Sequence, residues 1–383
     1  MLPWTGEDFE GSLLTNRLLA ISNHAEMLGG GEHSFIDLLC HLPDTWQVLA
    51  AVPDEGELTR RLKQKGLKTF TLPLPPIRSW KLFRALQGLE AHSRLYKSLR
   101  PDIIYANGSR AALYGGMIGR IFGIPVVWHC RIAETDPYLD PLLIRLSSKI
   151  VANSQATAAR FATPFQKRIK VVYNGIDIHW LRQDNLQKPE LIKDEWKVIL
   201  NVARVSKSKR HDLVLSAFEE VAGANPRSHL VFLGAKDQWE PDWWEYLMIK
   251  SRESSFSDRI HWVGYVEDVR PWYRAAHMMV LTSENESFGR VIVEAMACGV
   301  PVIATRSGGI PEIIRHQQDG LLVTPGNVKE LQAAFSILLR DQAFRDRYAK
   351  SAQKRAECFS LDSHVGKMVE ILENTLALRK RVQ

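Results

Sequence analysis

Two carboxylates, Glu286 and Glu294, have the surroundings most suggestive of chemistry in this sequence. The apolar run His277 to Leu281 predicts a buried strand, and Arg290 to Cys298 predicts a buried helix closed by glycine and proline. Glu286 would therefore lie in the loop at the carboxyl end of the strand, and Glu294 on the helix. An ionised carboxylate accepts two hydroxyl hydrogen bonds, as a ribose diol or the edge of a hexose requires. The pair is thus suited to holding a polyhydroxylated ligand.

The start of the predicted helix adds a place for an anion. Phe288 and Gly289 leave free backbone N–H groups beside Glu286, and a helix N-terminus attracts anions such as a diphosphate. The simpler alternative is a glutamate-capped core helix that binds nothing. Spacing alone does not separate the two interpretations, because such pairs of glutamates occur by chance in most chains.

The longer string around these residues is more specific. It reads ExFGRVxVEAMACGxPVIATxxGGxPEII from Glu286 onwards and resembles the donor-site signature of the family 4 retaining glycosyltransferases, which have the GT-B fold. The resemblance implies that Glu286 lies beside the donor sugar and that Glu294 holds the ribose. The donor-binding loop is expected to include Ser287, Phe288, Gly289 and Arg290.

Two cations form a second candidate element. The apolar run Val198 to Val202 ends just before Arg204, and Lys209 precedes the amphipathic helix predicted over Asp212 to Val221. Cations at a strand end and a helix start can converge on one diphosphate through charge-assisted hydrogen bonds; the alternative is two solvated surface charges. The stretch resembles the family's Arg and Lys pair that holds the leaving diphosphate. It departs from the family pattern at Arg210, where a glycine is common, and this departure puts the shape of the loop in question.

Two features of the first half complete the candidate site. The run Leu18 to Ser22 predicts a strand, and the glycines that follow lead into an apolar-periodic helix. Glycines at such a turn let the backbone approach a phosphate, although a glycine run alone is more often only a turn. The run matches the family's GGxE loop, so Gly30 and Gly31 are expected over the donor phosphates and the acceptor. His129, after the predicted strand Val126 to Trp128, matches a family histidine that faces the donor sugar; a lone histidine at such a place is otherwise usually a core or surface residue.

Alternating apolar and helical patterns predict two parallel-sheet domains. The chain has 383 residues, and single cores seldom grow far beyond ~250 residues. Strand, helix, strand repetition is typical of parallel sheets with helices on both faces, whose ligands bind outside the carboxyl ends of the strands. Besides those named above, strands are predicted over 102–106, 125–129, 149–153, 168–173, 230–234, 259–263, 300–305 and 321–323.

The expected fold is therefore α/β, with two Rossmann-like doubly wound domains that face across a cleft. Residues 1–178 would bind the acceptor and residues 179–360 the nucleotide-sugar donor. Asn174 to Asp177 resembles the family's crossing between the domains, and a last helix within 361–383 would, by resemblance, cross back towards the first domain.

Cysteines and apolar stretches indicate the cofactors and the location. No metal-ligand spacing is seen among Cys40, Cys130, Cys298 and Cys358, and scattered thiols fit a reducing cytosol. No metal or other cofactor is expected, because Arg204, Lys209 and a helix N-terminus would neutralise the diphosphate. Acidic residues precede the first apolar run, where a signal peptide would be basic, and no apolar stretch reaches the ~18 residues that span a bilayer. A cytoplasmic protein is expected, either soluble or peripheral on the inner face of the membrane.

The positive charge is concentrated in the first domain. The chain holds 50 Lys and Arg against 43 Asp and Glu, and residues 1–180 hold 21 of the former against 16 of the latter. Arg60 to Arg100 contains eleven basic residues and the single acid Glu90. The helix predicted over Trp80 to Leu99 is a basic amphipathic surface of the kind that lies on anionic membranes; the alternative is a solvated face. No nucleic-acid partner is expected, because no reading motif accompanies the charge.

Together these features predict a retaining hexosyltransferase that moves a sugar from a nucleotide-diphosphate sugar to a sugar or lipid-linked acceptor, in polysaccharide or glycolipid synthesis. Glu286, Arg204, Lys209 and His129 are the expected catalytic residues. The alternatives are a nucleotide-sugar epimerase or a phosphorylase of the same fold, and a catalytically silent binding subunit. The sequence leaves the nucleotide, the sugar and the acceptor open.

Overall fold

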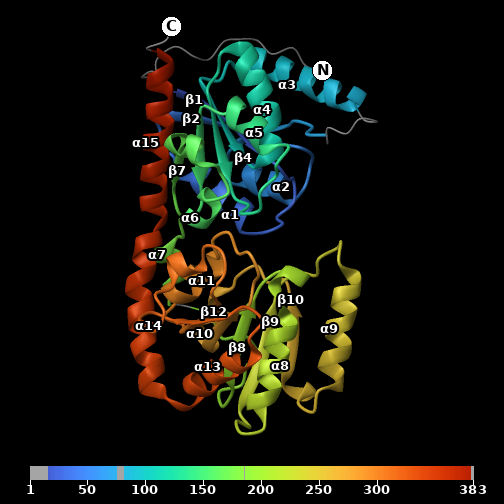
Figure 1. Cartoon of the computed structure of the whole chain (residues 1–383), viewed down its shortest axis with the longest axis vertical. Coiled ribbons are helices and arrows are strands. Elements are labelled where there is room, and N and C mark those ends of the chain that lie inside the picture. Colours follow the sequence, from blue (N-terminus) through green and yellow to red (C-terminus); the bar gives the residue numbers. More distant parts are fainter. Residues whose placement is uncertain (1–15, 76–81, 185, 381–383) are drawn as a thin grey trace.

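Two parallel β-sheets, one above the other and each flanked by helices, form the protein (Figure 1). The computed structural model describes residues 16–75, 82–184 and 186–380. The first sheet has seven strands in the order β3-β2-β1-β4-β5-β6-β7, and the second has six in the order β10-β9-β8-β11-β12-β13. All the strand pairs are parallel, so the predicted pair of Rossmann-like domains is confirmed.

The first domain contains seven strands and six α-helices among the described residues. Its strands are β1 (Asn16–Ser22), β2 (Trp46–Val52), β3 (Lys68–Thr71), β4 (Ile103–Asn107), β5 (Val126–Cys130), β6 (Lys149–Ala152) and β7 (Ile169–Val171). Its helices are α1 (Gly30–Cys40), α2 (Glu57–Gln64), α3 (Leu82–Leu99), α4 (Ser109–Phe122), α5 (Asp140–Leu146) and α6 (Gln155–Ala158).

The second domain follows the same plan. Its strands are β8 (Lys197–Val202), β9 (Ser228–Leu233), β10 (Ile260–Gly264), β11 (Ala276–Leu281), β12 (Val302–Thr305) and β13 (Leu321–Val323). Its helices are α7 (Ile178–Leu181), α8 (His211–Ala222), α9 (Pro241–Glu253), α10 (Arg270–Ala275), α11 (Arg290–Ala297), α12 (Ile310–Ile313), α13 (Val328–Arg340) and α14 (Gln342–Ala356), and α15 (Leu361–Lys380) closes the chain.

Burial on both faces explains why the strands read as continuous apolar runs. In β1, Leu19 and Ile21 belong to one buried cluster, whereas Leu18 and Ala20 belong to another on the opposite face of the sheet. Side chains alternate across a strand, so a sheet covered on both faces demands an apolar residue at every position. The same rule makes these strands predictable from sequence.

The strand order fixes where ligands can bind. In each sheet the chain moves outwards in one direction from a central strand and then returns to that strand's other side, so β1 pairs with β4 and β8 pairs with β11. The place between these two central strands, where the strand order reverses, is the switch point of the sheet. Loops that leave the two strands there diverge, and ligands usually bind at the carboxyl ends of these strands. Arg204 follows β8 and Glu286 follows β11, so the topology brings together two loops that are far apart in sequence.

Two strands of the first sheet had not been predicted. β2 contains two consecutive alanines, and alanine is a weak strand former, while β3 is a short, partly exposed edge strand of four residues. The expected basic helix is present as α3, although Trp80, Arg78 and Lys81 lie outside the described residues. Among the helices that the structure describes, none combines the length and the apolar character needed to cross a bilayer.

The last helices run along one side of both domains (Figure 1). α14 packs on the second domain, whereas Leu361, Val365 and Met368 of α15 join the buried cluster formed by β1, β2 and α1 of the first domain. α15 therefore lies against the first domain. The exact boundaries at residues 178 and 360 stay predictions.

Among the polar contacts between the domains, two involve acidic side chains close to the facing sheet edges. Arg290 of α11 pairs with Asp37 of α1 at 2.7 Å. Glu312 of α12 accepts the backbone N–H groups of Gln155 and Ala156 at 2.7 and 2.9 Å, at the start of α6. A carboxylate there satisfies N–H groups that have no partner within the helix. These contacts hold the donor-side loops against the first domain.

The buried histidines predict a loss of stability in mild acid. Burial, the largest cause, lowers the pKa of His92, His211 and His364 to about 4 and the pKa of His129 well below its usual value near 6.5. Between these values the rings stay neutral in the folded chain but bind protons in the unfolded chain, so the free energy of unfolding falls as the pH falls. Each ring should add a slope of about 1.4 kcal/mol per pH unit. Urea unfolding between about pH 5 and pH 7.5 measures this slope.

A matched pair of variants isolates one ring. His92→Phe removes a buried histidine that stacks on Tyr114, and it should flatten the dependence. His179→Gln, at an exposed position, should leave the dependence as it is in the parent chain. Equal slopes in the two variants would show that His92 does not titrate in this way.

The link between Asp37 and Arg290 should be measurable as a coupling free energy. Both side chains are mostly buried, at 25% and 14% exposure, so solvent screens their attraction little. A double-mutant cycle with Asp37→Asn and Arg290→Met should give a coupling of roughly 0.5–3 kcal/mol in the free energy of unfolding. The exposed pair Glu90 and Arg94 of α3 is the control, and it should give about 0.2–1 kcal/mol. A coupling no larger than that of the control would mean that the pair does not hold the domains together.

Candidate functional site

The centre of the candidate site lies on the loops after β8 and β11. These loops are tied together, because the backbone N–H of Glu284 donates to the Ser208 carbonyl at 2.8 Å and the Thr282 hydroxyl donates to the Lys209 carbonyl at 2.9 Å. The predicted residues Lys209 and Glu286 consequently meet, as expected for two loops at one switch point. The sheet order, not the sequence spacing, creates this contact.

Lys209 and Glu286 form a close ion pair. The Lys209 Nζ lies 2.6 Å from Glu286 Oε2, and the two side chains are 24% and 15% exposed. Burial alone would raise the pKa of the Glu286 carboxyl, but the Lys209 charge and a hydrogen bond from the Phe288 backbone N–H outweigh it, and the pKa is lowered. Glu286 is therefore ionised at neutral pH and acts as a fixed negative charge rather than as a proton donor.

Arg204 has a different carboxylate partner. Its Nε lies 3.3 Å from Asp237 Oδ2, and its side chain is 38% exposed. Its charge also acts on two residues of the first domain. Burial lowers the pKa of His24, and the charges of Arg110 and Arg204 lower it further. Burial raises the pKa of Glu32, and the charge of Arg204 reduces this rise. The two predicted cations thus lie at the same sheet edge, and each is held by its own acid.

Arg210 keeps the loop shape that a glycine would give. The residue has φ 50° and ψ 48°, which is the left-handed conformation that glycine adopts most readily. Its guanidinium contacts Asp212 at 2.9 and 3.0 Å and Glu284 at 2.6 Å. These charge-assisted bonds offset the backbone strain, so the departure from the family pattern leaves the loop intact.

Two glycines hold the Glu286 loop by close backbone approach. Gly289 begins α11 with φ 93°, and Gly308 has φ 52°. A Cβ atom at Gly308 would lie 2.1 Å from the Glu286 carbonyl oxygen, and the next residue, Gly309, donates its N–H to that oxygen at 2.7 Å. The GGxPE part of the signature therefore shapes the backbone under Glu286.

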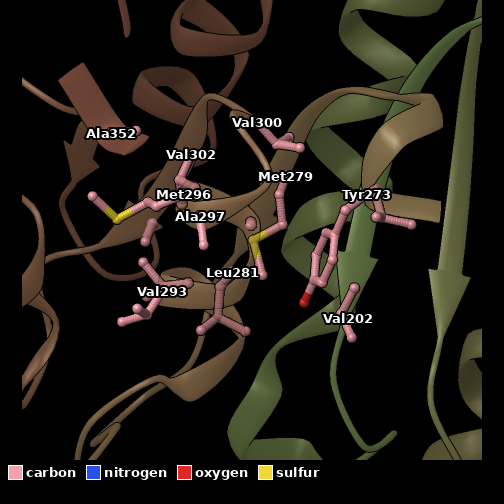
Figure 2. Close-up of a cluster of buried hydrophobic side chains, with 14 of the residues drawn as sticks. Val202, Tyr273, Met279, Leu281, Val293, Met296, Ala297, Val300, Val302 and Ala352 are labelled. Atoms are coloured by element: carbon pink, nitrogen blue, oxygen red, sulfur yellow. The ribbon is translucent and has the colours of Figure 1, made fainter. Parts of the chain in front are cut away.

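Glu294 is held by two neighbours. Its carboxylate accepts from Arg290 Nε at 2.8 Å and from the Tyr273 hydroxyl at 3.2 Å. The apolar face of α11 anchors this arrangement, since Val293 and Met296 pack with Met279 of β11 in the core beneath the site (Figure 2). Burial would lower the pKa of Arg290, but the charges of Asp37 and Glu294 outweigh it and raise the pKa. Arg290, predicted to bind the donor, thus bridges Glu294 to the first domain.

The two remaining loop residues contribute backbone and packing. Phe288 is 2% exposed, and its ring stacks with Tyr173 at 6.1 Å. The Ser287 hydroxyl accepts a hydrogen bond from Asn153 of the first domain at 3.4 Å. The side chain of Phe288 is therefore part of the core, while its N–H faces Glu286.

The glycine run lies where the domains meet. α1 begins at Gly30, and Glu32 accepts the Gly29 N–H at 3.0 Å, which caps the helix. A Cβ atom at Gly30 would lie 3.5 Å from the Arg290 Cβ atom, and one at Gly31 would lie 3.3 Å from Arg131 Cδ. Gly31 thus gives Arg131 room that a side chain would reduce, whereas a Cβ atom at Gly30 would make only an ordinary contact with Arg290.

His129 is placed deeper than expected. Its side chain is fully buried, and its Nδ1 lies in hydrogen-bonding contact with the Tyr105 hydroxyl at 2.7 Å. Burial, followed by the charges of Arg131 and His364, lowers its pKa, so the ring is neutral. Its Nε2 has no hydrogen-bond partner among the described residues. A sugar hydroxyl would reach Nε2 only after neighbouring groups move.

Several polar residues at the site had not been predicted. Arg131 of the β5 loop donates to Asn107 and to Asn174 at 2.5 and 2.7 Å, and Asp37 and Glu312 bridge the domains as described above. Asn107 and Arg131 come directly after predicted strands, a position that the sequence does reveal. Asp37 and Glu312 lie within helices, where nothing in the sequence distinguishes them from surface acids. In the part of the chain that the structure describes, no group of three or more His, Cys, Asp or Glu is placed to hold a metal ion.

Comparison with known proteins covers both domains. The family model described as Glycosyltransferase Family 4 matches residues 28–180, and the model described as Glycosyl transferases group 1 matches residues 182–355. The structure of Anabaena Alr3699/HepE in complex with UDP and glucose superposes with a TM-score of 0.82 and 23% identity, over 94% of this chain and all of that chain. This likeness confirms the expected GT-B fold.

Similar sequences include proteins whose names describe enzymes. The N-acetyl-alpha-D-glucosaminyl L-malate synthase of Bacillus anthracis is 31% identical over 62% of this chain and 64% of its own length. The D-inositol 3-phosphate glycosyltransferase of Thermobifida fusca is 26% identical over 72% of this chain and 70% of its own length. The match to the uncharacterized glycosyltransferase MJ1607 of Methanocaldococcus jannaschii spans 57% of that protein. This chain therefore spans less than two thirds of the length of MJ1607 and of the Bacillus anthracis protein. Since the two family models together match most of the first and of the second domain, the chain belongs to the group 1 glycosyltransferases of family 4.

Proposed function

We propose that this chain is a retaining glycosyltransferase that moves a hexose-type sugar from a nucleotide-diphosphate sugar to an acceptor. The observation that carries the proposal is the pairing of Lys209 with an ionised, half-buried Glu286 at the switch point of the second sheet. A half-buried lysine and carboxylate, with Arg204 at the same sheet edge, suit a ligand that combines a diphosphate with a sugar.

In this proposal the cations act on the leaving group. Arg204 and Lys209 bind the diphosphate and stabilise the charge that builds on it, and loss of such a group typically costs ~10²–10³ in rate. A diphosphate would take over part of the contact that each cation now makes with Asp237 or Glu286. These two charges let the reaction proceed without a resident metal.

The carboxylates bind the two sugars of the donor. Glu286 lies beside the transferred sugar and stabilises its positive character in the transition state, which an ionised side chain can do and a protonated one cannot. Glu294 accepts the ribose hydroxyls. We propose that the acceptor attacks the same face of the sugar that the diphosphate leaves, and that a phosphate oxygen takes the acceptor's proton, so no side chain serves as the base.

The nucleotide proposed is UDP, and the acceptor is proposed to be anionic. The Anabaena structures were solved with UDP, with UDP and glucose, and with UDP-glucose. The names of two relatives contain L-malate and D-inositol 3-phosphate, which are both anions at neutral pH. A lipid-linked or polysaccharide precursor at the cytoplasmic face of the membrane would fit both this charge and the basic first domain.

The rival functions differ in their products. An epimerase would convert the nucleotide sugar without an acceptor, and a phosphorylase would need inorganic phosphate. Analysis of the products formed from UDP-glucose, with and without an acceptor and with and without inorganic phosphate, separates them. A silent binding subunit would tolerate Lys209→Ala, whereas a transferase would lose turnover.

The division of roles between the glutamates predicts different binding losses. Glu294→Ala should weaken the binding of free UDP, because it removes the ribose contact, whereas Glu286→Ala should leave UDP binding nearly intact and still abolish most turnover. Titration calorimetry with UDP, GDP and ADP measures the binding and identifies the base. Equal losses of UDP affinity in the two variants would reject the assignment, and no binding of any nucleotide by the parent chain would reject the function.

The basic region between Arg60 and Arg100 predicts salt-sensitive attachment to anionic vesicles. Lys97 and Arg100 are exposed at the end of α3, and raising the salt shortens the screening length from ~10 Å at 0.1 M to ~3 Å at 1 M. Co-sedimentation with anionic vesicles should therefore fall at high salt and in the Lys97→Glu, Arg100→Glu variant. Lys350→Glu with Lys354→Glu, on exposed positions of α14, is the charge-matched control. Equal binding to neutral and anionic vesicles would favour a soluble acceptor.

A further inference from the structure

The guanidinium of Arg131 is a half-buried charge whose hydrogen-bond partners are neutral side chains. Its Nε donates to Asn107 Oδ1 at 2.5 Å, its Nη1 to Asn174 Oδ1 at 2.7 Å and its Nη2 to the Tyr105 hydroxyl at 3.3 Å. All three partners are neutral. Among residues 16–75, 82–184 and 186–380, no carboxylate is found in ion-pairing contact with Arg131.

Two other arginines show how a guanidinium can be balanced by carboxylates. Arg160 pairs with Asp140, and these side chains are 3% and 11% exposed. Arg290, 14% exposed, pairs with both Asp37 and Glu294. A charge withdrawn from water is costly unless an opposite charge accompanies it. Arg259 and Arg355, which are half-buried, donate instead to backbone carbonyls, whereas Arg131 donates to neutral side chains at the edge of the first sheet.

The neighbours of Arg131 do not supply the missing charge. Burial, followed by the charge of Arg131, lowers the pKa of His129 and of His364, so both rings are neutral. Burial raises the pKa of Glu32, and the charge of Arg131 acts in the opposite direction. The Glu32 carboxylate does not pair with Arg131, because it accepts the Gly29 N–H and caps α1. The surroundings of Arg131 are therefore polar, neutral and partly withdrawn from solvent.

The position of Arg131 is that of a ligand contact. It follows β5, and its partner Asn107 ends β4, so the guanidinium lies at the carboxyl edge of the first sheet beside the switch point. Its Cδ atom lies 3.3 Å from where a Cβ atom of Gly31 would be, and Gly30 meets Arg290 of the second domain. Arg131 is thus next to the glycine loop at the meeting of the two domains.

The hydrogen bonds leave donors for a further partner. A guanidinium has five N–H groups in one plane, and three of them are used by the bonds above. One hydrogen remains on Nη1, and one remains on Nη2 apart from a long approach of 3.4 Å to His129 Nδ1. The planar N–H groups of a guanidinium suit the paired oxygens of a carboxylate or a phosphate.

We propose that Arg131 binds the carboxylate or phosphate of the acceptor and so determines that the acceptor is anionic. The proposal rests on the transferase function proposed above for the meaning of "acceptor", but the anion site itself can be tested separately. Asn107, Asn174 and Tyr105 hold the guanidinium in a fixed orientation, so the site is built before the anion arrives. The anion then supplies the charge that the protein lacks.

The test is titration calorimetry of the full chain, saturated with UDP, with glycerol 3-phosphate, L-malate and neutral glycerol as probes. The parent chain should bind at least one anionic probe more tightly than glycerol, and Arg131→Gln should weaken that binding at least ~10-fold, the factor expected for loss of a charge-assisted pair. Arg145→Gln is the control, because it makes the same change of charge at an exposed position of α5. Affinity for UDP should be unchanged in both variants.

Three results would overturn the proposal: no anionic probe bound by the parent chain, equal weakening by Arg131→Gln and Arg145→Gln, or unchanged binding in Arg131→Gln. If Arg131→Gln does not fold, Arg131→Lys is the second variant, because it keeps the charge but loses the paired N–H groups of the guanidinium. It should still lower the affinity for the anionic probe and leave UDP binding intact. An unchanged affinity for the anionic probe would overturn the proposal. An anion bound through Arg131 by a chain that transfers no sugar would reject the proposed function while supporting the anion site.

Discussion

A carboxylate withdrawn from water needs an opposite charge, and this requirement at Glu286 governs the second domain around it. Burial would raise the pKa of the carboxyl, and Lys209, 2.6 Å away, reverses that effect. The two residues come from loops after β8 and β11, so their contact exists only because these strands are neighbours at the switch point. The Gly308 backbone closes the loop from the other side, where any side chain would strike the Glu286 carbonyl.

Charge balance also decides how the domains meet. Arg290 lies between Asp37 of the first domain and Glu294 of the second, and Glu312 satisfies the first N–H groups of α6. Arg204, Lys209 and Arg290 therefore each have an acid partner. In the proposed function, a diphosphate would exchange contacts with these acids and would not fill an uncompensated charge. The first domain is different, because Arg131 has only neutral partners.

The strands and most site residues were predictable because their determinants are local. A strand buried on both faces must be apolar at each position, as in β4, where all five residues are buried. The glycines and charges of the signature follow such strands directly, which is how Arg204, Lys209 and Glu286 could be assigned to one sheet edge. β2 and β3 escaped prediction, since one contains adjacent alanines and the other is short and half exposed. Arg210 shows that a local rule can be met by other means, because hydrogen bonds to Asp212 and Glu284 hold it in the conformation of a glycine.

The sequence by itself thus determined the fold class, the strand ends and the type of charge at each of them, because these depend on neighbouring residues. Only the tertiary structure decided which charges meet. Nothing local relates Asp37 to Arg290, or Asn107 and Asn174 to Arg131, since each contact joins segments that are distant in the chain and are brought together by strand order and domain packing. The depth of His129 was likewise decided by packing, because α15 returns to the first domain and places His364 against its ring at 6.2 Å.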